Sequence, residues 1–319
     1  MILALLWVSC AIAAFLYTRI YNIPAATALA VFPAFLLEAT FFYALALETV
    51  RARLEKLPRV GLAWGLTVAA VAPYLVASLA LGSFQWRSLF WIAALGAAAS
   101  FWYVVLPHKP VSDLLFLLFM AVVWLSRIFH GLYVSPHPKV PLDALGQLMW
   151  FRTGIFAMIS VRRIKGVGFG FWPKAREWRI GAAYYVLFVP VAAVLAWWIG
   201  FARFKAPLLG WERTSFLTIV TFFGVLWVLA LAEEFFFRGL LQQWMTAWLH
   251  SEWGGLVLTS LLFGSAHLWY RAFPNWRFAA MAGAAGAFYG LAFRQASSIR
   301  ASMVTHALVV TTWRIFFSG

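Results

Sequence analysis

Two adjacent glutamates and an arginine interrupt an otherwise apolar stretch in the last third of the chain. The stretch reads Val225-Leu-Trp-Val-Leu-Ala-Leu-Ala-Glu-Glu-Phe-Phe-Phe-Arg-Gly239. On a helix, Glu234 and Arg238 lie four residues apart with the acid first, which favours an ion pair. Glu233 points about 100° away from Glu234. We therefore expect Glu234 and Arg238 to neutralise each other, and Glu233 to be free to act as a general base.

Two histidines follow in later apolar segments, His267 in Phe263-Gly-Ser-Ala-His267 and His306 in Ser302-Met-Val-Thr-His306. Hydrolysis of a peptide bond needs a base that activates water and donors that stabilise the oxyanion. Glu233 and His267 could polarise the water while His306 faces the developing oxyanion. The sequence thus contains the parts of a hydrolytic site.

A metal is the competing account, because two histidines and a carboxylate form a legitimate zinc set. The ligands of a metal-dependent enzyme would be Glu233, His267 and His306. Against this, the sequence has no His-Glu-x-x-His motif. Glu234 is also expected to pair with Arg238, so it is not available as a further metal ligand. We therefore favour no cofactor, with zinc as the alternative.

The composition indicates the elements that must position these residues. Hydrophobic residues make up 64% of the 319 residues, charged residues only 11%, and the mean hydropathy is +0.86. A soluble domain carries roughly 25% charged residues, so the chain is expected to be an integral, multi-pass membrane protein. Its 25 Lys and Arg against ten acids give a formal charge of +15. These cations lie between apolar spans, where they set topology and contact anionic head groups rather than nucleic acid.

A spanning helix needs about 20 mostly apolar residues. The sequence predicts an all-α transmembrane bundle of about ten spans, or eleven if the segment 143–161 also crosses. That segment carries Arg152 in its middle, and the alternative is an amphipathic helix in the membrane interface. The ten spans are expected near residues 2–18, 25–49, 60–82, 88–107, 111–130, 178–201, 215–245, 255–271, 277–294 and 299–317.

Two basic linkers, 51–59 and 162–179, are informative about topology. The positive-inside rule places such linkers in the cytoplasm, which puts the N-terminus there too, because the first linker follows the second span. Ten spans would leave the two linkers on opposite sides of the membrane, whereas eleven would bring them to the same side.

The polar residues and linkers divide the chain into three parts. We expect N-terminal accessory transmembrane helices over 1–135, a basic linker with an amphipathic or spanning helix over 136–177, and a catalytic helical bundle over 178–319. The glycine-rich piece 166–170 is expected to be a flexible linker. Glu38 and Arg127 are ionisable residues that stand isolated within the accessory spans.

The polar motifs resemble a known family. Glu233-Glu234-x-x-x-Arg238, Phe263-x-x-x-His267 and a late His306 are similar to motifs of the CAAX prenyl protease and bacteriocin-processing (CPBP, or Abi) intramembrane endopeptidases. The segments Gly286-Ala-Phe-Tyr-Gly290 and 298–308 are similar to that family's final helices. The resemblance covers roughly 180–317.

The resemblance implies an all-helical endopeptidase that cuts a membrane-anchored protein or peptide. It assigns water activation to Glu233 and His267, and the oxyanion to His306 together with an Asn four residues later. Position 310 is Val310 here, so that donor is missing or replaced, with Thr305, Thr311 and Thr312 as candidate replacements. The alternative function is a catalytically impaired, CPBP-like membrane scaffold or immunity protein.

Overall fold

The computed structural model describes residues 2–201, 203–205 and 210–318. The chain forms two compact units, Met1–Ile164 (unit 1) and Lys165–Gly319 (unit 2). The boundary lies next to the glycine-rich piece noted in the sequence. The three-part division of 1–135, 136–177 and 178–319 stays a prediction.

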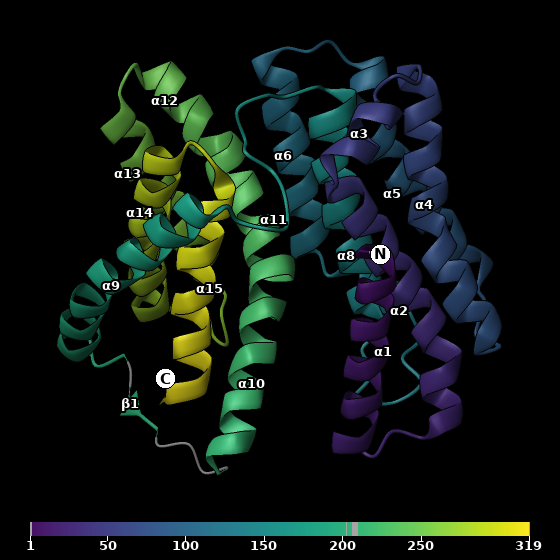
Figure 1. Ribbon diagram of the computed structural model, residues 1–319. Helices are drawn as coiled ribbons and strands as arrows, with labels where there is room; N and C mark the ends of the chain where they lie inside the picture. The colour runs from purple at the N-terminus through teal and green to yellow at the C-terminus, as the bar shows by residue number, and fades with distance from the viewer. Residues whose placement is uncertain (1, 202, 206–209, 319) are drawn as a thin grey trace. The chain divides into compact units, whose positions relative to one another are not determined.

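Unit 1 consists of helices joined by short turns (Figure 1). Prolines directly precede the first residue of α2 and α4, where a missing N–H costs no helical hydrogen bond. The helices are α1 (Ile2–Ile20), α2 (Ala25–Ala46), α3 (Glu48–Leu54), α4 (Arg59–Ala80), α5 (Trp86–Val105), α6 (Pro110–Leu125), α7 (Ile128–Leu132), α8 (Asp143–Phe156) and the π-helix η1 (Ala157–Val161).

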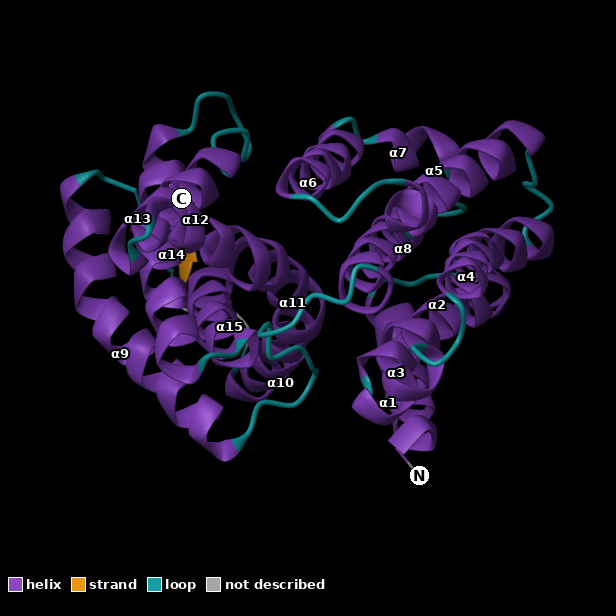
Figure 2. Ribbon diagram, turned by 90° about the horizontal axis from the view of Figure 1, so that it is seen from above, coloured by secondary structure: helices purple, strands orange, loops and turns teal. Residues whose placement is uncertain are grey.

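Unit 2 packs α9, α13, α14 and α15 against one another (Figure 2), and a second helical run with mixed α and π geometry joins them. A short antiparallel pair of strands links the segment after α9 to the end of α15. The elements are α9 (Ala175–Trp198), β1 (Arg203–Phe204), α10 (Trp211–Gly224), η2 (Val225–Ala230), α11 (Leu231–Glu234), η3 (Phe235–Gln242), α12 (Gln243–Leu249), α13 (Glu252–Ala266), α14 (Trp276–Ala296), α15 (Ile299–Phe316) and β2 (Phe317–Ser318).

The chain is a polytopic helical membrane protein. Seven helical segments of the described residues are long and apolar enough to cross a bilayer: Leu3–Ile20, Ala25–Ala46, Arg59–Ala80, Trp86–Val105, Asp143–Val161, Ala175–Trp198 and Thr214–Leu249. The expected count was ten. The segments expected near 111–130, 255–271, 277–294 and 299–317 do form helices (α6, α13, α14 and α15), but α6 and α13 have only 16 and 15 residues. The remaining two helices, α14 and α15, are long enough but are rich in small and polar residues.

The segment 143–161 is one of the seven, and most of its residues are buried inside unit 1. An amphipathic interfacial helix would instead leave one whole face outside the protein. The burial therefore favours the spanning interpretation of this segment over the interfacial one.

The two basic linkers meet at one end of unit 1. Arg163 Nη2 donates to the carbonyl oxygen of Glu55 at 3.0 Å, and Ser160 Oγ donates to Glu55 Oε1 at 3.2 Å. The contact places the two linkers at the same end of unit 1, which is the arrangement expected when both α6 and the segment 143–161 cross together with α4 and α5.

The glycine-rich piece is anchored in unit 2, which corrects its interpretation as a flexible linker. Val167 accepts a backbone hydrogen bond from Ile299 at 3.0 Å, and Gly168 accepts one from Ser298 Oγ at 3.1 Å. Gly168 has a φ of +63°, and a Cβ there would lie 2.6 Å from Ser298 Cα. Glycine is needed at 168 for both the backbone conformation and the close approach.

Glu38 is not isolated, because the structure pairs it with Arg152. Arg152 Nε and Nη2 donate to the two Glu38 oxygens at 2.6 and 2.9 Å, and both side chains are almost completely buried. Arg152 Nη2 also donates to the carbonyl oxygen of Ala69 at 2.9 Å. Pro73 lacks the N–H that would satisfy this carbonyl within α4. Arg152 therefore joins α2, α4 and α8 at one point.

We expect Arg152→Leu to lower the free energy of unfolding by about 3–5 kcal/mol, because it leaves Glu38 buried without a counter-ion. Denaturant unfolding in detergent would measure the change, with the exposed Arg87 changed to Leu as the control. The double variant Glu38→Leu/Arg152→Leu should be less destabilised than Arg152→Leu alone. Additive losses would contradict the pairing.

Candidate active site

The glutamate pair lies in a helical run with altered geometry. α11, which ends on Glu233 and Glu234, lies between the π-helices η2 and η3. A π-helix has i→i+5 hydrogen bonds and is found frequently at functional sites. The run thus changes its helical geometry on both sides of the two carboxylates.

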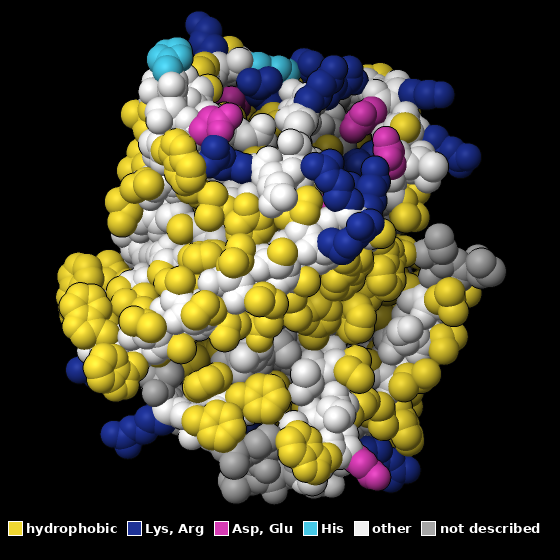
Figure 3. Space-filling view, turned by 60° about the vertical axis from the view of Figure 1, so that its left-hand side comes forward, with side chains coloured by type: hydrophobic (Ala, Val, Ile, Leu, Met, Phe, Trp, Pro, Cys, Tyr) yellow, Lys and Arg dark blue, Asp and Glu magenta, His cyan; other side chains and the backbone are white. Residues whose placement is uncertain are grey.

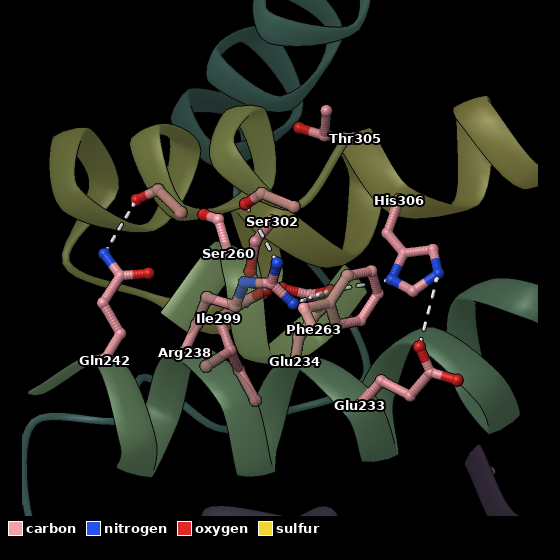
Figure 4. Close-up of polar contacts among 12 residues, drawn as sticks. Glu233, Glu234, Arg238, Gln242, Ser260, Phe263, Ile299, Ser302, Thr305 and His306 are labelled. Carbon is pink, nitrogen blue, oxygen red and sulfur yellow. Dashed lines mark hydrogen bonds and ion pairs between the residues drawn. The ribbon is translucent and has the colours of Figure 1, made fainter. Parts of the chain in front are cut away.

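Glu234 is held by two donors inside unit 2 (Figure 4). Its Oε1 accepts from Arg238 Nη1 at 3.0 Å and from His306 Nδ1 at 2.7 Å. All three residues are nearly inaccessible to solvent. Arg238 Nη2 also donates to the carbonyl oxygen of Gly286 at 2.9 Å. The pairing expected from the four-residue spacing is therefore present, and His306 of α15 is a second partner that the spacing did not indicate.

Glu233 lies on the other side of the same imidazole. Its Oε2 is 3.8 Å from His306 Nε2, and its side chain is 20% exposed, whereas that of Glu234 is fully buried. Within the described residues, Glu233 Oε2 has no hydrogen-bond partner. Glu233 is thus the less constrained of the two carboxylates.

Aromatic rings fix the positions of Arg238 and His306. Tyr289 stacks on the His306 ring with centroids 4.5 Å apart, and Phe263 meets that ring edge-on at 5.9 Å. The Arg238 guanidinium lies over Phe263 at 4.4 Å and over Tyr289 at 5.2 Å. A Cβ at position 286 would lie 3.0 Å from Arg238 Nη2, so Gly286 leaves room for the guanidinium.

His267 lies at the C-terminal end of α13 and packs against Phe263, whose ring also meets His306. The two rings are 4.7 Å apart, and His267 Nδ1 bonds to the carbonyl oxygen of Phe263 at 2.7 Å. A carbonyl only accepts, so Nδ1 carries the hydrogen and Nε2 of the neutral ring keeps a lone pair. In the described part of the chain, no ion pair joins His267 to either glutamate.

Comparison with known families identifies the segment that contains this geometry. Residues 215–312 match the family model described as "Type II CAAX prenyl endopeptidase Rce1-like". This segment is an Rce1-like domain. No curated protein and no solved structure matches the chain.

The Rce1-like domain contains Glu233, Glu234, Arg238, His267 and His306, together with Val310. Unit 1 and the whole of α9 lie outside it. The match of residues 215–312 agrees with the resemblance seen in the sequence.

The described acids and histidines of the Rce1-like domain do not converge on one point. Within the described residues, no three His, Cys, Asp or Glu side chains converge closely enough to hold a metal ion. Glu233 and His306 approach each other, but His267 does not complete the zinc set that the sequence offered.

The three threonines near Val310 differ in their partners. Thr305 Oγ1 donates to the carbonyl oxygen of Gly181 at 3.0 Å, and Thr312 Oγ1 pairs with the Tyr185 hydroxyl at 2.9 Å. Thr311 Oγ1 is buried and has no hydrogen-bond partner in the described residues. Thr311 therefore is the one of the three whose hydroxyl is not already engaged.

Sequence reasoning gave Tyr289 and Gly286 no role, although it noted the motif Gly286-Ala-Phe-Tyr-Gly290. The spacing of that motif carried the signal, because residues 286 and 289 lie three apart and share a helix face. In the Rce1-like domain this face meets Arg238 and His306.

Arg238→Leu should destabilise the protein by about 3–5 kcal/mol, because Glu234 would lose its buried counter-ion. The matched control is Arg294→Leu, which removes an arginine paired with Glu252, whose side chain is 69% exposed. That change should cost about 1 kcal/mol or less. Unfolding in detergent would measure both. Equal losses for the two variants would contradict the difference in burial.

Proposed function

We infer from the Rce1-like domain that this protein is an intramembrane protease. We propose that this protein is an intramembrane endopeptidase of the glutamate type, which hydrolyses a peptide bond of a membrane-anchored protein or peptide. The observation that carries the proposal is Glu233, a carboxylate next to His306 that lacks the arginine partner of Glu234.

In the proposed reaction, Glu233 and His267 activate the attacking water. Glu233 accepts a proton from water, and Nε2 of His267 can accept a hydrogen bond from the same molecule. The hydroxide attacks the carbonyl carbon, and the proton then passes to the leaving amine as the C–N bond breaks. This step needs substrate and water to bridge Glu233 and His267.

His306 is proposed to stabilise the oxyanion. Its Nδ1 donates to Glu234, so Nε2 can donate to an oxyanion only when the ring carries both protons. Glu234 then serves as the counter-ion, and Arg238 limits the negative charge that Glu234 would otherwise place in the site. Tyr289 keeps the imidazole plane fixed for this contact.

The proposed topology has eleven passes with a cytoplasmic N-terminus. In unit 2, Arg300 pairs with Glu177 at 2.8 Å and Arg176 donates to the carbonyl oxygen of Gln295 at 3.0 Å. These contacts bring the start of α9, the end of α14 and the start of α15 to one end. Figure 3 shows Lys and Arg gathered mainly beyond one edge of a broad hydrophobic zone. The positive-inside rule puts such an edge in the cytoplasm, against anionic head groups.

Glu233→Gln should abolish cleavage, because an amide cannot take a proton from water. The assay substrate is a fluorogenic, farnesylated peptide ending in a CAAX sequence, the substrate class named in the family description. The control is Glu212→Gln, which changes an exposed glutamate of the same unit. If Glu233→Gln cleaved at the wild-type rate, the assignment of the base would be wrong. Loss of cleavage with a chelator and recovery with zinc would favour a metalloprotease.

The second candidate function is a catalytically impaired scaffold or immunity protein, and Val310 favours it. An oxyanion donor contributes about 10²–10³ in rate. If the donor is missing, Val310→Asn should raise the cleavage rate by a factor of that order, whereas the control Val309→Asn should not. An ordinary wild-type rate that Val310→Asn leaves unchanged would exclude the impaired-enzyme alternative.

A further inference from the structure

A polar pocket of about 570 Å³ lies within unit 2, and neither Glu233 nor Glu234 lines it. It is bordered by η3 and α12, by the start of α13 and by the end of α14. Its polar lining includes Gln242, Thr246, Glu252 and Arg294, with Tyr184 and Trp253 beside them. Pockets of this size hold ligands of several residues or a drug-sized molecule.

Gln242 lines this pocket and lies on the same helical run as Glu234 and Arg238. Glu234, Arg238 and Gln242 follow one another at four-residue intervals, and the last two donate to consecutive turns of α14. Arg238 contacts the carbonyl of Gly286, and Gln242 Nε2 contacts that of Gly290 at 3.2 Å. Figure 4 shows the three side chains along one helix, with Gln242 at the end away from His306.

Gln242 also has unused hydrogen-bonding capacity. The residue is 2% exposed, and its Oε1 is buried with no partner among the described residues. A buried acceptor without a donor is costly, and a ligand N–H would satisfy it. A peptide backbone offers such donors at regular intervals.

The mouth of the pocket is charged and aromatic. Arg294 pairs with Glu252 and lies over the Trp253 ring at 4.5 Å, and Trp253 is 63% exposed. A prenyl or acyl chain would leave these amide, hydroxyl and charged groups without partners. The pocket chemistry therefore favours a polar, extended peptide over a lipid chain.

The separation along the helix sets the register of such a peptide. Arg238 and Gln242 contact carbonyls four residues apart on the α-helix α14, which is roughly 6 Å at 1.5 Å per residue, and Glu234 precedes Arg238 by the same interval, so Gln242 lies roughly 12 Å from Glu234 along the helix. An extended peptide covers that distance in about four residues at 3.3 Å each. We infer that this pocket binds the substrate peptide about four residues from the bond that is cut, with Gln242 and Thr246 as specificity-determining contacts. The inference rests on the proposed endopeptidase function.

The test uses the same farnesylated CAAX peptide with full-length protein in detergent. Gln242→Met and Thr246→Val should each raise KM at least fivefold while kcat stays within twofold. Binding of the intact peptide to the Glu233→Gln protein, measured by anisotropy, should weaken by the same factor when either change is added. Thr218→Val is the matched control, since its hydroxyl bonds only locally, to the carbonyl of Thr214 at 2.8 Å. Thermal unfolding of each variant checks that it is folded.

Photo-crosslinking provides a readout that does not depend on cleavage or on the stability of the variants. A benzoylphenylalanine placed at Thr246 in the Glu233→Gln protein should capture the peptide, and one at Val194, exposed on α9, should not. Mass spectrometry should locate the crosslink about four residues from the cleaved bond.

The outcomes separate the two proposals. If Glu233→Gln abolishes cleavage but neither pocket variant changes KM or binding, the pocket inference is wrong and the protease stands. If the wild type binds the peptide through Gln242 and Thr246 without cutting it, the pocket stands and the protease proposal fails. If the peptide binds neither the wild type nor any variant, the pocket inference is overturned.

Discussion

The structure depends on pairing two fully buried carboxylates, Glu38 and Glu234, with arginines. An unpaired charge inside a membrane protein costs several kcal/mol. Glu38 meets this constraint with Arg152, and Glu234 meets it with Arg238, and in both pairs the side chains are at most 1% exposed. Each arginine also donates to a backbone carbonyl of a neighbouring helix. The ion pairs therefore neutralise charge and join helices in the same contact.

Glu233, in contrast, has no arginine partner among the described residues. It lies beside a fully paired glutamate, but among the described residues its ionic contact is His306 at 3.8 Å. Glu234 accepts the hydrogen bond that holds the His306 imidazole, and Glu233 lies next to the same ring. Arg238 and Tyr289 then restrict Glu234 and His306 to one geometry, which is the preorganisation that a catalytic site requires.

Local spacing carried much of the information about the site. The pair Glu234–Arg238 follows from positions four apart on one helix, and the periodic apolar segments indicated a helical membrane protein. Pairings between distant residues could not be found in this way. Glu38 and Arg152 are 114 residues apart, and Glu234 and His306 are 72 apart. These contacts are set by which helix faces pack together, and periodicity alone does not specify that packing.

The span count and the glycine-rich piece show the same limit. α14 and α15 were expected to be ordinary apolar spans, but they are rich in small and polar residues, some of which contact Arg238, Glu234 and the start of α9. Gly166–Gly170 has the composition of a flexible linker. Glycine is required at position 168 because the backbone there passes close to Ser298, a contact that only the folded chain creates.

The most direct measurement of the central claim is carboxyl labelling with a hydrophobic carbodiimide, which reacts with membrane-embedded carboxyl groups that are not held in ion pairs. Mass spectrometry of the labelled protein would compare Glu233, Glu234 and Glu38 in one sample. We expect rapid labelling of Glu233 and little labelling of the two paired glutamates. Labelling of Glu234 or Glu38 at the rate of Glu233, or an unreactive Glu233, would contradict the claim that ion pairing leaves this one carboxylate free for chemistry.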